Sequence, residues 1–401
     1  MRVLQINNVY GRLSTGKIVA DLHHAYTELG LESYVCYARG PVVHEEGVHK
    51  FSWEVYAKAN KIRGRMTGML YGGCYLATLR LIRKIKTIQP DVVHLHCIND
   101  DSVNIYLLLN YLKKNHIPTV VALHAEFMYT GSCGNAYHCD KWKTGCYGCE
   151  QYKAMHMLFD NTKYAWEKMR RPFAGFNEDQ IMITSVSPWL ESRAAESAIL
   201  GHFPHCTVMN GVNTEVFYAR DAKALRTELR IPGDKKIALF VTSDMDSPSK
   251  GGEHLIELAH SLPEYVFVVL GTPGTRNDLP ENIMCVGRIY DQKKVAQYYS
   301  MADVTLILSK AETFSMPVAE SLCCGTPVVG FKAGGPETIA VREYSRFCEQ
   351  RDTIQLYQWL LDIDRLFDAP RCEIAEKAIK KYGKENMVSE YIQVYNSVLE
   401  L

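Results

Sequence analysis

Short apolar runs alternate with stretches of helical periodicity along most of the chain, and these runs are rich in valine, isoleucine and aromatic residues. Such runs predict buried strands, and their alternation with helices predicts βα units and parallel sheets. The predicted strands form two series. The first is VLQIN near Val3, SYVCYA near Tyr34, VVHLH from Val92, TVVALH from Thr119 and IMITSVS from Ile181; the second is KIALFVT from Lys236, YVFVVLG from Tyr265, IMCVG from Ile283, VTLIL from Val304 and PVVGF from Pro327.

The segment VMNGVNTEVF, from Val208 to Phe217, combines a final apolar strand with an Asn-Gly turn pair, so we place the domain boundary within it. Residues 384–401 carry apolar side chains at helical spacing and predict an amphipathic helix that returns to the first domain. Two similar α/β domains would leave a cleft between them as the natural ligand site. The predicted domains are therefore 1–212 and 213–383, followed by this helix.

At 401 residues the chain is long enough for two or three domains that each bury a core. Its 45 basic and 45 acidic residues give a net charge of zero, which argues against a nucleic-acid partner. Met1 and Arg2 lead directly into the first strand and not into a secretory leader. We therefore expect a cytoplasmic protein.

The longest weakly charged stretch, Met66 to Thr78, is shorter than the ~20 apolar residues of a membrane-spanning helix. It is flanked by the basic residues Arg63, Arg65, Arg80, Arg83, Lys84 and Lys86. This arrangement fits peripheral contact with an anionic surface at the inner face of a membrane, or contact with a lipid-linked acceptor. A buried helix pair with solvated basic ends is the alternative.

Two carboxylates lie near the end of the strand VTLIL. Glu312 follows the strand, and Glu320 lies in a short helix that Pro317 begins and Gly325 ends. Ligands of open α/β sheets bind outside the carboxyl ends of the strands, where amides at a helix start attract phosphate or sugar oxygens. Two carboxylates at this edge can accept hydrogen bonds from a polyol. The alternative is an ordinary capped helix with solvated acids.

A pattern of acidic, glycine and proline positions in this region resembles the donor site of the GT4 family of retaining GT-B glycosyltransferases. Its residues are Glu312, Phe314, Glu320, Gly325, Pro327, Gly334, Gly335 and Glu337. The resemblance covers most of the chain and implies an α/β GT-B fold, with two Rossmann-like parallel-sheet domains facing a central cleft. It also implies that Glu320 holds the ribose hydroxyls of a nucleotide sugar and that Glu312 holds hydroxyls of the transferred sugar. The amides around Phe314, Ser315 and Met316 would face the sugar and the diphosphate.

Three further residues are candidates for binding the diphosphate or the base. Lys250 precedes Gly251 and Gly252 at a helix start and resembles the phosphate-binding lysine of the family; its ammonium can neutralise the leaving diphosphate, aided by the amides of these glycines or by Arg288. The loop that contains Arg288 is also a weaker candidate for packing against the nucleotide base. A solvated surface lysine is the alternative. Gly16 follows the first strand, ahead of a helix where a diphosphate can approach bare amides. Since many GT4 members have two adjacent glycines where this chain has Thr15 and Gly16, a purely structural turn is the alternative.

His124 ends the strand TVVALH, at the rim where catalytic groups of α/β proteins collect. The resemblance implies that a histidine at this strand end points to the donor sugar, without acting as a nucleophile. Retention would then follow front-face displacement: the nucleotide diphosphate leaves, the sugar becomes oxocarbenium-like, and the acceptor hydroxyl enters from the same side. The phosphate would accept the acceptor's proton. His96 and His94 are the alternative histidines.

Thirteen cysteines in a cytoplasmic chain favour free thiols or a metal site over disulfides. Four of them, Cys133, Cys139, Cys146 and Cys149, cluster in the loop-rich stretch 131–150. Four thiolates can form a tetrahedral zinc site, which would be structural because no coordination position remains for a substrate. The stretch resembles a cysteine-rich insertion in a subset of GT4 enzymes of bacterial surface polysaccharide biosynthesis. Paired or free thiols are the alternative.

The residues and the resemblance together predict a retaining, hexosyltransferase-type enzyme. It would move a sugar from a nucleotide-sugar donor to a glycan or lipid-linked acceptor, in surface polysaccharide biosynthesis. The second domain would hold the donor, the first would choose the acceptor, and catalysis would require no cofactor. The alternatives are a GT-B nucleotide-sugar epimerase and a catalytically silent nucleotide-sugar binding protein. The donor's base and sugar, the acceptor, the linkage and the oligomeric state do not follow from the sequence.

Overall fold

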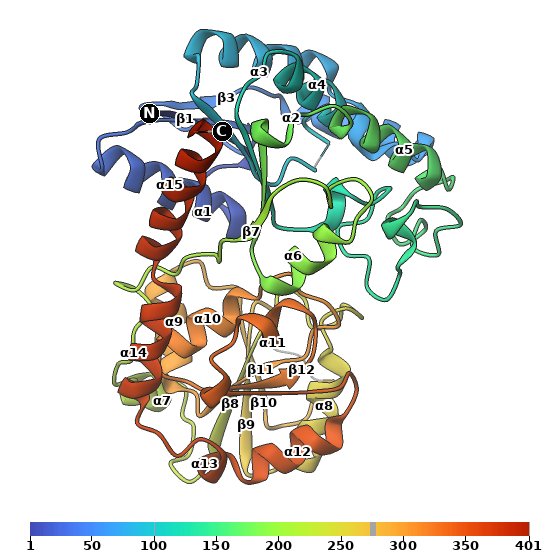
Figure 1. Ribbon diagram of the computed structural model, residues 1–401. Helices are drawn as coiled ribbons and strands as arrows, with labels where there is room; N and C mark the ends of the chain where they lie inside the picture. The colour runs from blue at the N-terminus through green and yellow to red at the C-terminus, as the bar shows by residue number, and fades with distance from the viewer. Residues whose placement is uncertain (100, 273–277, 401) are drawn as a thin grey trace. The chain divides into compact units, whose positions relative to one another are not determined.

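The computed structural model describes residues 1–99, 101–272 and 278–400 (Figure 1). Contacts between Cα atoms divide the chain into two compact units. The N-terminal unit runs from Met1 to Met209 and includes the C-terminal stretch from Met387 onward, and the C-terminal unit is Asn210–Asn386. Each unit is an α/β domain built on its own sheet.

The N-terminal unit contains a seven-stranded parallel sheet with the strand order β3-β2-β1-β4-β5-β6-β7. Its strands are β1 (Arg2–Val9), β2 (Glu32–Arg39), β3 (Val48–Lys50), β4 (Val92–Leu95), β5 (Thr119–Leu123), β6 (Ile181–Ser185) and β7 (His205–Thr207). Its helices are α1 (Leu13–Glu28), α2 (Glu54–Thr67), α3 (Tyr75–Ile88), α4 (Ile105–Lys114), α5 (Thr162–Phe173) and α6 (Pro188–Ala195).

The C-terminal unit contains a six-stranded parallel sheet with the order β10-β9-β8-β11-β12-β13. Its strands are β8 (Lys236–Val241), β9 (Tyr265–Leu270), β10 (Ile283–Gly287), β11 (Val304–Ile307), β12 (Val328–Phe331) and β13 (Ser345–Cys348). Its helices are α7 (Lys223–Glu228), α8 (Gly252–Ser261), α9 (Gln292–Met301), α10 (Met316–Cys323), α11 (Gly335–Ile339), α12 (Thr353–Leu361), α13 (Ile363–Leu366) and α14 (Arg371–Tyr382).

All ten predicted strand regions contain strands, which confirms the α/β class with two parallel sheets. The apolar pattern did not reveal β3, β7 and β13, which are three or four residues long and lie at sheet edges. The prediction of a strand at Val208 was wrong, because β7 ends at Thr207. An edge strand pairs on one side only and is less buried, so its sequence carries a weaker apolar signal.

The last helix, α15 (Lys384–Glu400), is the predicted amphipathic helix. From Met387 onward its apolar side chains join the core of the N-terminal unit, where Tyr391 and Tyr395 pack with Val3 of β1 and Leu22 of α1. Figure 1 shows this red helix beside α1. Burying one face of the helix against α1 and β1 ties the C-terminus to the N-terminal unit.

Each sheet reverses its strand order at one place, between β1 and β4 in the N-terminal unit and between β8 and β11 in the C-terminal unit. Loops that leave the carboxyl ends of these two strands diverge to opposite faces of the sheet, which opens a crevice for ligands. The topology therefore predicts that ligands bind at the loops after β1 and β4 in one unit and after β8 and β11 in the other.

Candidate active site

The switch point of the C-terminal sheet carries an ion pair between two residues that the sequence assigned to the donor site. Lys250 lies in the loop after β8, and Glu312 lies in the loop after β11, the neighbouring strand. The Lys250 ammonium Nζ lies 2.7 Å from Glu312 Oε1, and both side chains are partly exposed, at 31% and 26%. An ammonium and a carboxylate thus stand together where a ligand can reach them.

Backbone hydrogen bonds join the loops around this ion pair and fix their positions relative to one another. The amide of Lys310 donates to the carbonyl of Ser249 at 2.9 Å, which joins the β11 loop to the β8 loop. Glu312 donates its amide to the Ala333 carbonyl at 3.0 Å and accepts at its own carbonyl from the Gly335 amide at 2.8 Å. The loops after β8, β11 and β12 therefore form one connected surface.

Glycine is required where these loops approach most closely. A Cβ atom at Gly335 would lie 2.4 Å from the backbone of Thr313, and one at Gly251 would lie 2.2 Å from the Leu308 carbonyl oxygen. Glu337 accepts hydrogen bonds from the amides of Ala333 and Gly334, each at 2.9 Å, and so fixes the start of α11. Gly335, one of the glycines of the family pattern, therefore serves this close backbone packing.

The start of α10 has an unusual backbone. Ser315 precedes the helix with a φ of 79°, in the left-handed region that serine rarely adopts, and Phe314 before it is buried. Such a conformation costs about 1–3 kcal/mol and is found most often at ligand-binding positions. Met316 begins the helix and Pro317 lies in its first turn, as the sequence predicted for Pro317. The predicted contact of the backbone amides around Phe314, Ser315 and Met316 with the sugar and the diphosphate stays a prediction.

Glu320 has a partner that the sequence did not reveal. The hydroxyl of Tyr299, at the end of α9, donates to Glu320 Oε2 at 3.0 Å. Tyr299 is fully buried, and burial together with the neighbouring carboxylate raises its pKa well above the ordinary value. The phenol therefore stays a neutral donor that orients Glu320. In the sequence, Tyr299 is one of two adjacent tyrosines in an amphipathic helix pattern. Aromatic residues in such a pattern are typical of the core, so nothing marked Tyr299 as part of the site.

The other two predicted donor contacts lie elsewhere. Arg288 is exposed and follows β10, an edge strand two positions from β8 in the sheet. Gly16 lies inside α1 and not ahead of it, since the helix begins at Leu13; this corrects the predicted helix start. A Cβ at Gly16 would lie 2.9 Å from the Val9 side chain, so Gly16 lets α1 pack closely on β1. A ligand contact for either residue stays a prediction.

Three buried histidines cluster near the carboxyl ends of β4 and β5 in the N-terminal unit, where the His94 and His96 rings lie 3.9 Å apart. His124 Nε2 lies 3.2 Å from His96 Nδ1, and His96 Nε2 lies 3.2 Å from the Gln5 side-chain oxygen. His94 Nδ1 lies 2.7 Å from the Tyr395 hydroxyl of α15. Burial lowers the pKa of His124 to about 4 and lowers those of His94 and His96 well below the ordinary value. Burial thus favours the neutral form of all three imidazoles at pH 7, which fits a hydrogen-bonding role for His124.

Lowering the pH from 7 to 5 should destabilise the N-terminal unit. The pKa of His124 is about 4 in the folded protein, below the ~6.5 of an unfolded histidine, so the unfolded chain binds more protons between these values. The contribution of neutral His124 to the free energy of unfolding is complete above about pH 6.5 and is lost as the pH falls towards 4. Between pH 7 and pH 5, His124 alone should lower the free energy of unfolding by about 2 kcal/mol.

Thermal unfolding at pH 7 and pH 5 measures this loss, and His124→Gln provides the comparison because glutamine does not titrate. The variant should lose less stability between the two pH values than the parent protein. An equal loss in both proteins would show that His124 is not the group responsible.

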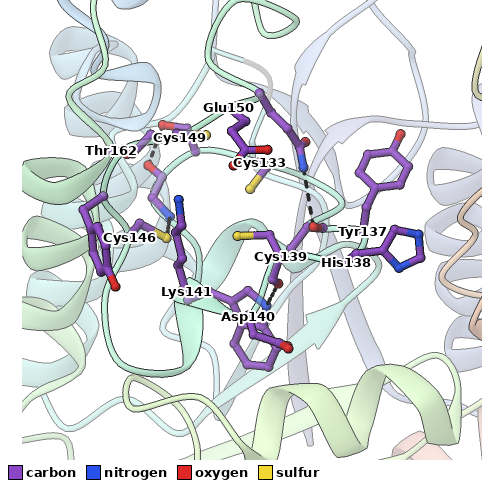
Figure 2. Close-up of a pocket in the computed structure, with 16 residues that line it drawn as sticks. Cys133, Tyr137, His138, Cys139, Asp140, Lys141, Cys146, Cys149, Glu150 and Thr162 are labelled. Atoms are coloured by element: carbon purple, nitrogen blue, oxygen red, sulfur yellow. Dashed lines mark hydrogen bonds between the residues drawn. The ribbon is translucent and has the colours of Figure 1, made fainter.

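The four clustered cysteines line a single cavity of about 430 Å³ in the N-terminal unit (Figure 2). The Gly131 amide donates to Cys146 Sγ at 3.2 Å, and burial raises the pKa values of Cys133 and Cys146 to about 12. Across residues 1–99, 101–272 and 278–400, however, no three His, Cys, Asp or Glu side chains are grouped so that they could hold a metal ion. The thiols are neighbours, but they are not arranged as a ligand set.

A structural zinc at these cysteines, and membership of the cysteine-rich subset, therefore stay predictions. Metal analysis of the purified protein under reducing conditions tests the first. Near-stoichiometric zinc that falls in Cys146→Ser and Cys149→Ser, but not in the exposed Cys372→Ser control, would support the site. Absence of zinc from the parent protein would rule out the predicted zinc site.

Comparison with known proteins begins with the C-terminal unit, where the family model for glycosyl transferases group 1 matches residues 221–386. N-acetyl-alpha-D-glucosaminyl L-malate synthase of Bacillus anthracis is 26% identical over 210 residues, which cover 48% of this chain and 54% of that protein. Alpha-monoglucosyldiacylglycerol synthase of Acholeplasma laidlawii is 25% identical over 279 residues, which cover 62% of this chain and 61% of that protein. The chain thus spans little more than half the length of these relatives.

Solved structures match over the whole chain. Sucrose-phosphate synthase from Thermosynechococcus elongatus superimposes with a TM-score of 0.72 and 16% identity, covering 100% of both chains. Anabaena HepE in complex with UDP gives a TM-score of 0.69 with 14% identity, covering 99% of this chain and 100% of the other. Likeness at this identity shows the fold. Residues 221–386 thus match the glycosyl transferases group 1, and the chain is GT4-like with a two-domain GT-B fold.

Proposed function

We propose that the protein is a retaining glycosyltransferase that moves a hexose-type sugar from a nucleotide-sugar donor to a glycan or lipid-linked acceptor. Its setting would be surface polysaccharide biosynthesis, in the cytoplasm or at the inner face of the membrane. The observation that carries the proposal is the Lys250–Glu312 pair at the switch point of the C-terminal sheet. One cation and one carboxylate at this place match a ligand that carries both a diphosphate and sugar hydroxyls.

The class of donor is supported by the solved structures of similar fold. Anabaena HepE is described in complex with UDP and in complex with UDP-glucose. A nucleoside diphosphate sugar is therefore the donor class that we infer for this chain.

In the proposed complex, Lys250 exchanges its present partner for the diphosphate. The ammonium now contacts Glu312, a partly exposed pair that costs little to separate, because exposed ion pairs contribute only about 0–1 kcal/mol. A diphosphate carries more negative charge than a carboxylate and would attract the ammonium more strongly. Glu312 would then be free to accept hydrogen bonds from sugar hydroxyls, while Glu320, oriented by Tyr299, accepts from the ribose.

His124 is assigned to the catalytic machinery as a neutral hydrogen-bonding group at the end of β5. Its low pKa argues against a general base that works near pH 7, because such a base needs a pKa close to that pH. This agrees with the proposed front-face route, in which the leaving diphosphate accepts the proton of the acceptor hydroxyl. The acceptor oxygen then bonds to the anomeric carbon on the face that the diphosphate leaves.

Incubation with a panel of UDP-, GDP- and ADP-sugars tests the proposal. A glycosyltransferase should release nucleoside diphosphate, slowly by hydrolysis when no acceptor is present and faster with its acceptor. Isomerised donor without release would support an epimerase instead. Binding without any turnover, measured calorimetrically, would support a silent nucleotide-sugar binding protein.

A further inference from the structure

A band of exposed apolar side chains covers one region of the N-terminal unit. Val55 is 80% exposed, and Leu158 and Phe159 are each 63% exposed, although side chains of this size are usually buried. The band comprises Trp53, Val55, Ile62, Met66, Tyr75, Leu76, Leu158, Phe159 and Tyr164. A concentration of this kind on one region marks an interaction surface more often than single exposed residues do.

Helix α2 presents the centre of this band. Val55, Ile62 and Met66 fall within about 40° of one another on a helix of 3.6 residues per turn, and all three are exposed. Ala57, Asn60 and Gly64 fall on the opposite side and are the buried residues of the helix. The helix is thus anchored to its own domain by small and polar residues, while its larger apolar side chains face outward.

Hydrogen bonds connect the neighbouring parts of the band to α2. The Leu158 amide donates to the Arg65 carbonyl at 2.9 Å, and the Asn161 side chain donates to the Thr67 carbonyl at 2.6 Å. At the other end, the Leu76 amide donates to the Tyr56 hydroxyl at 3.3 Å. The exposed residues before α5 and at the start of α3 therefore border α2. We call this region, residues 53–76 with 158–164, the α2 surface.

The α2 surface is basic although the chain as a whole is neutral. Its basic residues are Lys58, Lys61, Arg63, Arg65 and Lys163, and Arg80 stacks on Trp53 at 4.4 Å at its edge. Its two acidic residues are Glu54, which pairs with Arg39 and Lys50, and Asp160, which accepts from the Cys149 amide and from Thr162. Within the described part of the chain, none of these six basic residues pairs with a carboxylate, so the positive charge of the surface is not neutralised.

We propose that the α2 surface docks on an anionic lipid bilayer. An amphipathic helix with apolar side chains on its outer face and basic residues beside them lies in the plane of the headgroups, where both kinds of side chain are satisfied. Trp53 and Tyr75 are the amphipathic ring types that concentrate at membrane interfaces. No helix in the described ranges is both long and apolar enough to cross a bilayer, so this attachment would be peripheral.

The charge distribution favours a bilayer, and not a second copy of the chain or a nucleic acid, as the partner of the α2 surface. A second copy of the chain in a two-fold dimer would bring this basic surface against itself, and like charges would repel. A nucleic acid would satisfy the lysines and arginines but would leave the aliphatic side chains of α2 in water. An anionic bilayer supplies negative headgroups and an apolar interior together.

Co-sedimentation of the full chain with vesicles tests the proposal and needs no nucleotide sugar, so its outcome is independent of the proposed function. The protein should bind vesicles of mixed phosphatidylglycerol and phosphatidylcholine and should bind pure phosphatidylcholine much more weakly. The triple variant Val55→Ser, Ile62→Ser, Met66→Ser should bind the anionic vesicles about tenfold more weakly. Lys58→Gln with Lys61→Gln should weaken binding and reduce its dependence on salt.

Ile354→Ser with Leu361→Ser is the matched control, because these are exposed aliphatic residues on α12 in the other unit. The control should bind as the parent does, and circular dichroism should show that all variants keep their helices. Equal binding of the triple variant, or no binding of the parent to anionic vesicles, would overturn the proposal. So would a dimer in light scattering that the triple variant dissociates while vesicle binding is absent.

Discussion

Lys250→Ala should lower the rate of nucleoside diphosphate release, expressed as kcat/KM for the donor, by about 10²–10³-fold. A positioned donor that stabilises developing charge in the transition state is worth about 3–4 kcal/mol, and the Lys250 ammonium stands at the switch point where a leaving diphosphate would lie. The loss should fall mainly on kcat, because the negative charge on the diphosphate grows as the glycosidic bond breaks. Steady-state kinetics with the donor identified in the panel measures it.

Two variants make this result specific. Lys250→Arg keeps the positive charge and should recover part of the activity, whereas Lys223→Ala removes a lysine that is 91% exposed in the same unit and should change nothing. If Lys250→Ala retained the parent's kcat/KM, the assignment of the diphosphate to this loop would be rejected. Unfolding measurements should show little change in stability, since the ion pair with Glu312 is partly exposed.

Arg193→Met should destabilise the N-terminal unit by about 3–5 kcal/mol, because it leaves the buried carboxylate of Glu126 without the charged partner that Arg193 provides. Glu126 is fully buried, and its Oε1 lies 2.7 Å from Arg193 Nε. The same carboxylate accepts from the Tyr129 hydroxyl at 2.9 Å and from the Ala136 amide at 2.5 Å. This pair therefore joins α6, the segment just after β5 and the cysteine-rich stretch.

Urea unfolding, followed through tryptophan fluorescence, measures this effect. Adding Glu126→Gln to Arg193→Met should recover part of the lost stability, since the buried charge is then gone. Lys143→Met is the matched control: its partner Glu196 lies 2.7 Å away, but both side chains are exposed and the pair should contribute less than about 1 kcal/mol. Equal effects of Arg193→Met and Lys143→Met would contradict the account.

Much of the donor region could be predicted because its signals are local. An apolar run, a glycine and a helix pattern placed Lys250 before α8 and Glu312 after β11, and the structure agrees. Pro317 and Gly325 similarly marked the two ends of α10. The start of α1 was predicted too late, because a glycine near a helix start, such as Gly16, can lie either ahead of the helix or inside it.

Residues that act through distant partners escaped prediction. Tyr299 lies in a helix pattern typical of core residues, and only the packing of α9 against α10 brings its hydroxyl to Glu320. Arg193 and Glu126 are 67 residues apart, and nothing in either local sequence identifies the other as its partner. The short edge strands escaped for a related reason, because their burial depends on a single neighbour.

The sequence by itself determined the two series of βα units, the alternation of buried and exposed positions, and the two ends of α10. Periodicity records these features because each depends on the burial of side chains a few positions apart. Only the tertiary structure decided the strand order, the meeting of Lys250 with Glu312 across 62 residues, and the outward face of α2. Such contacts depend on which strands become neighbours, and that choice minimises the free energy of the whole domain, so no local stretch of sequence encodes it.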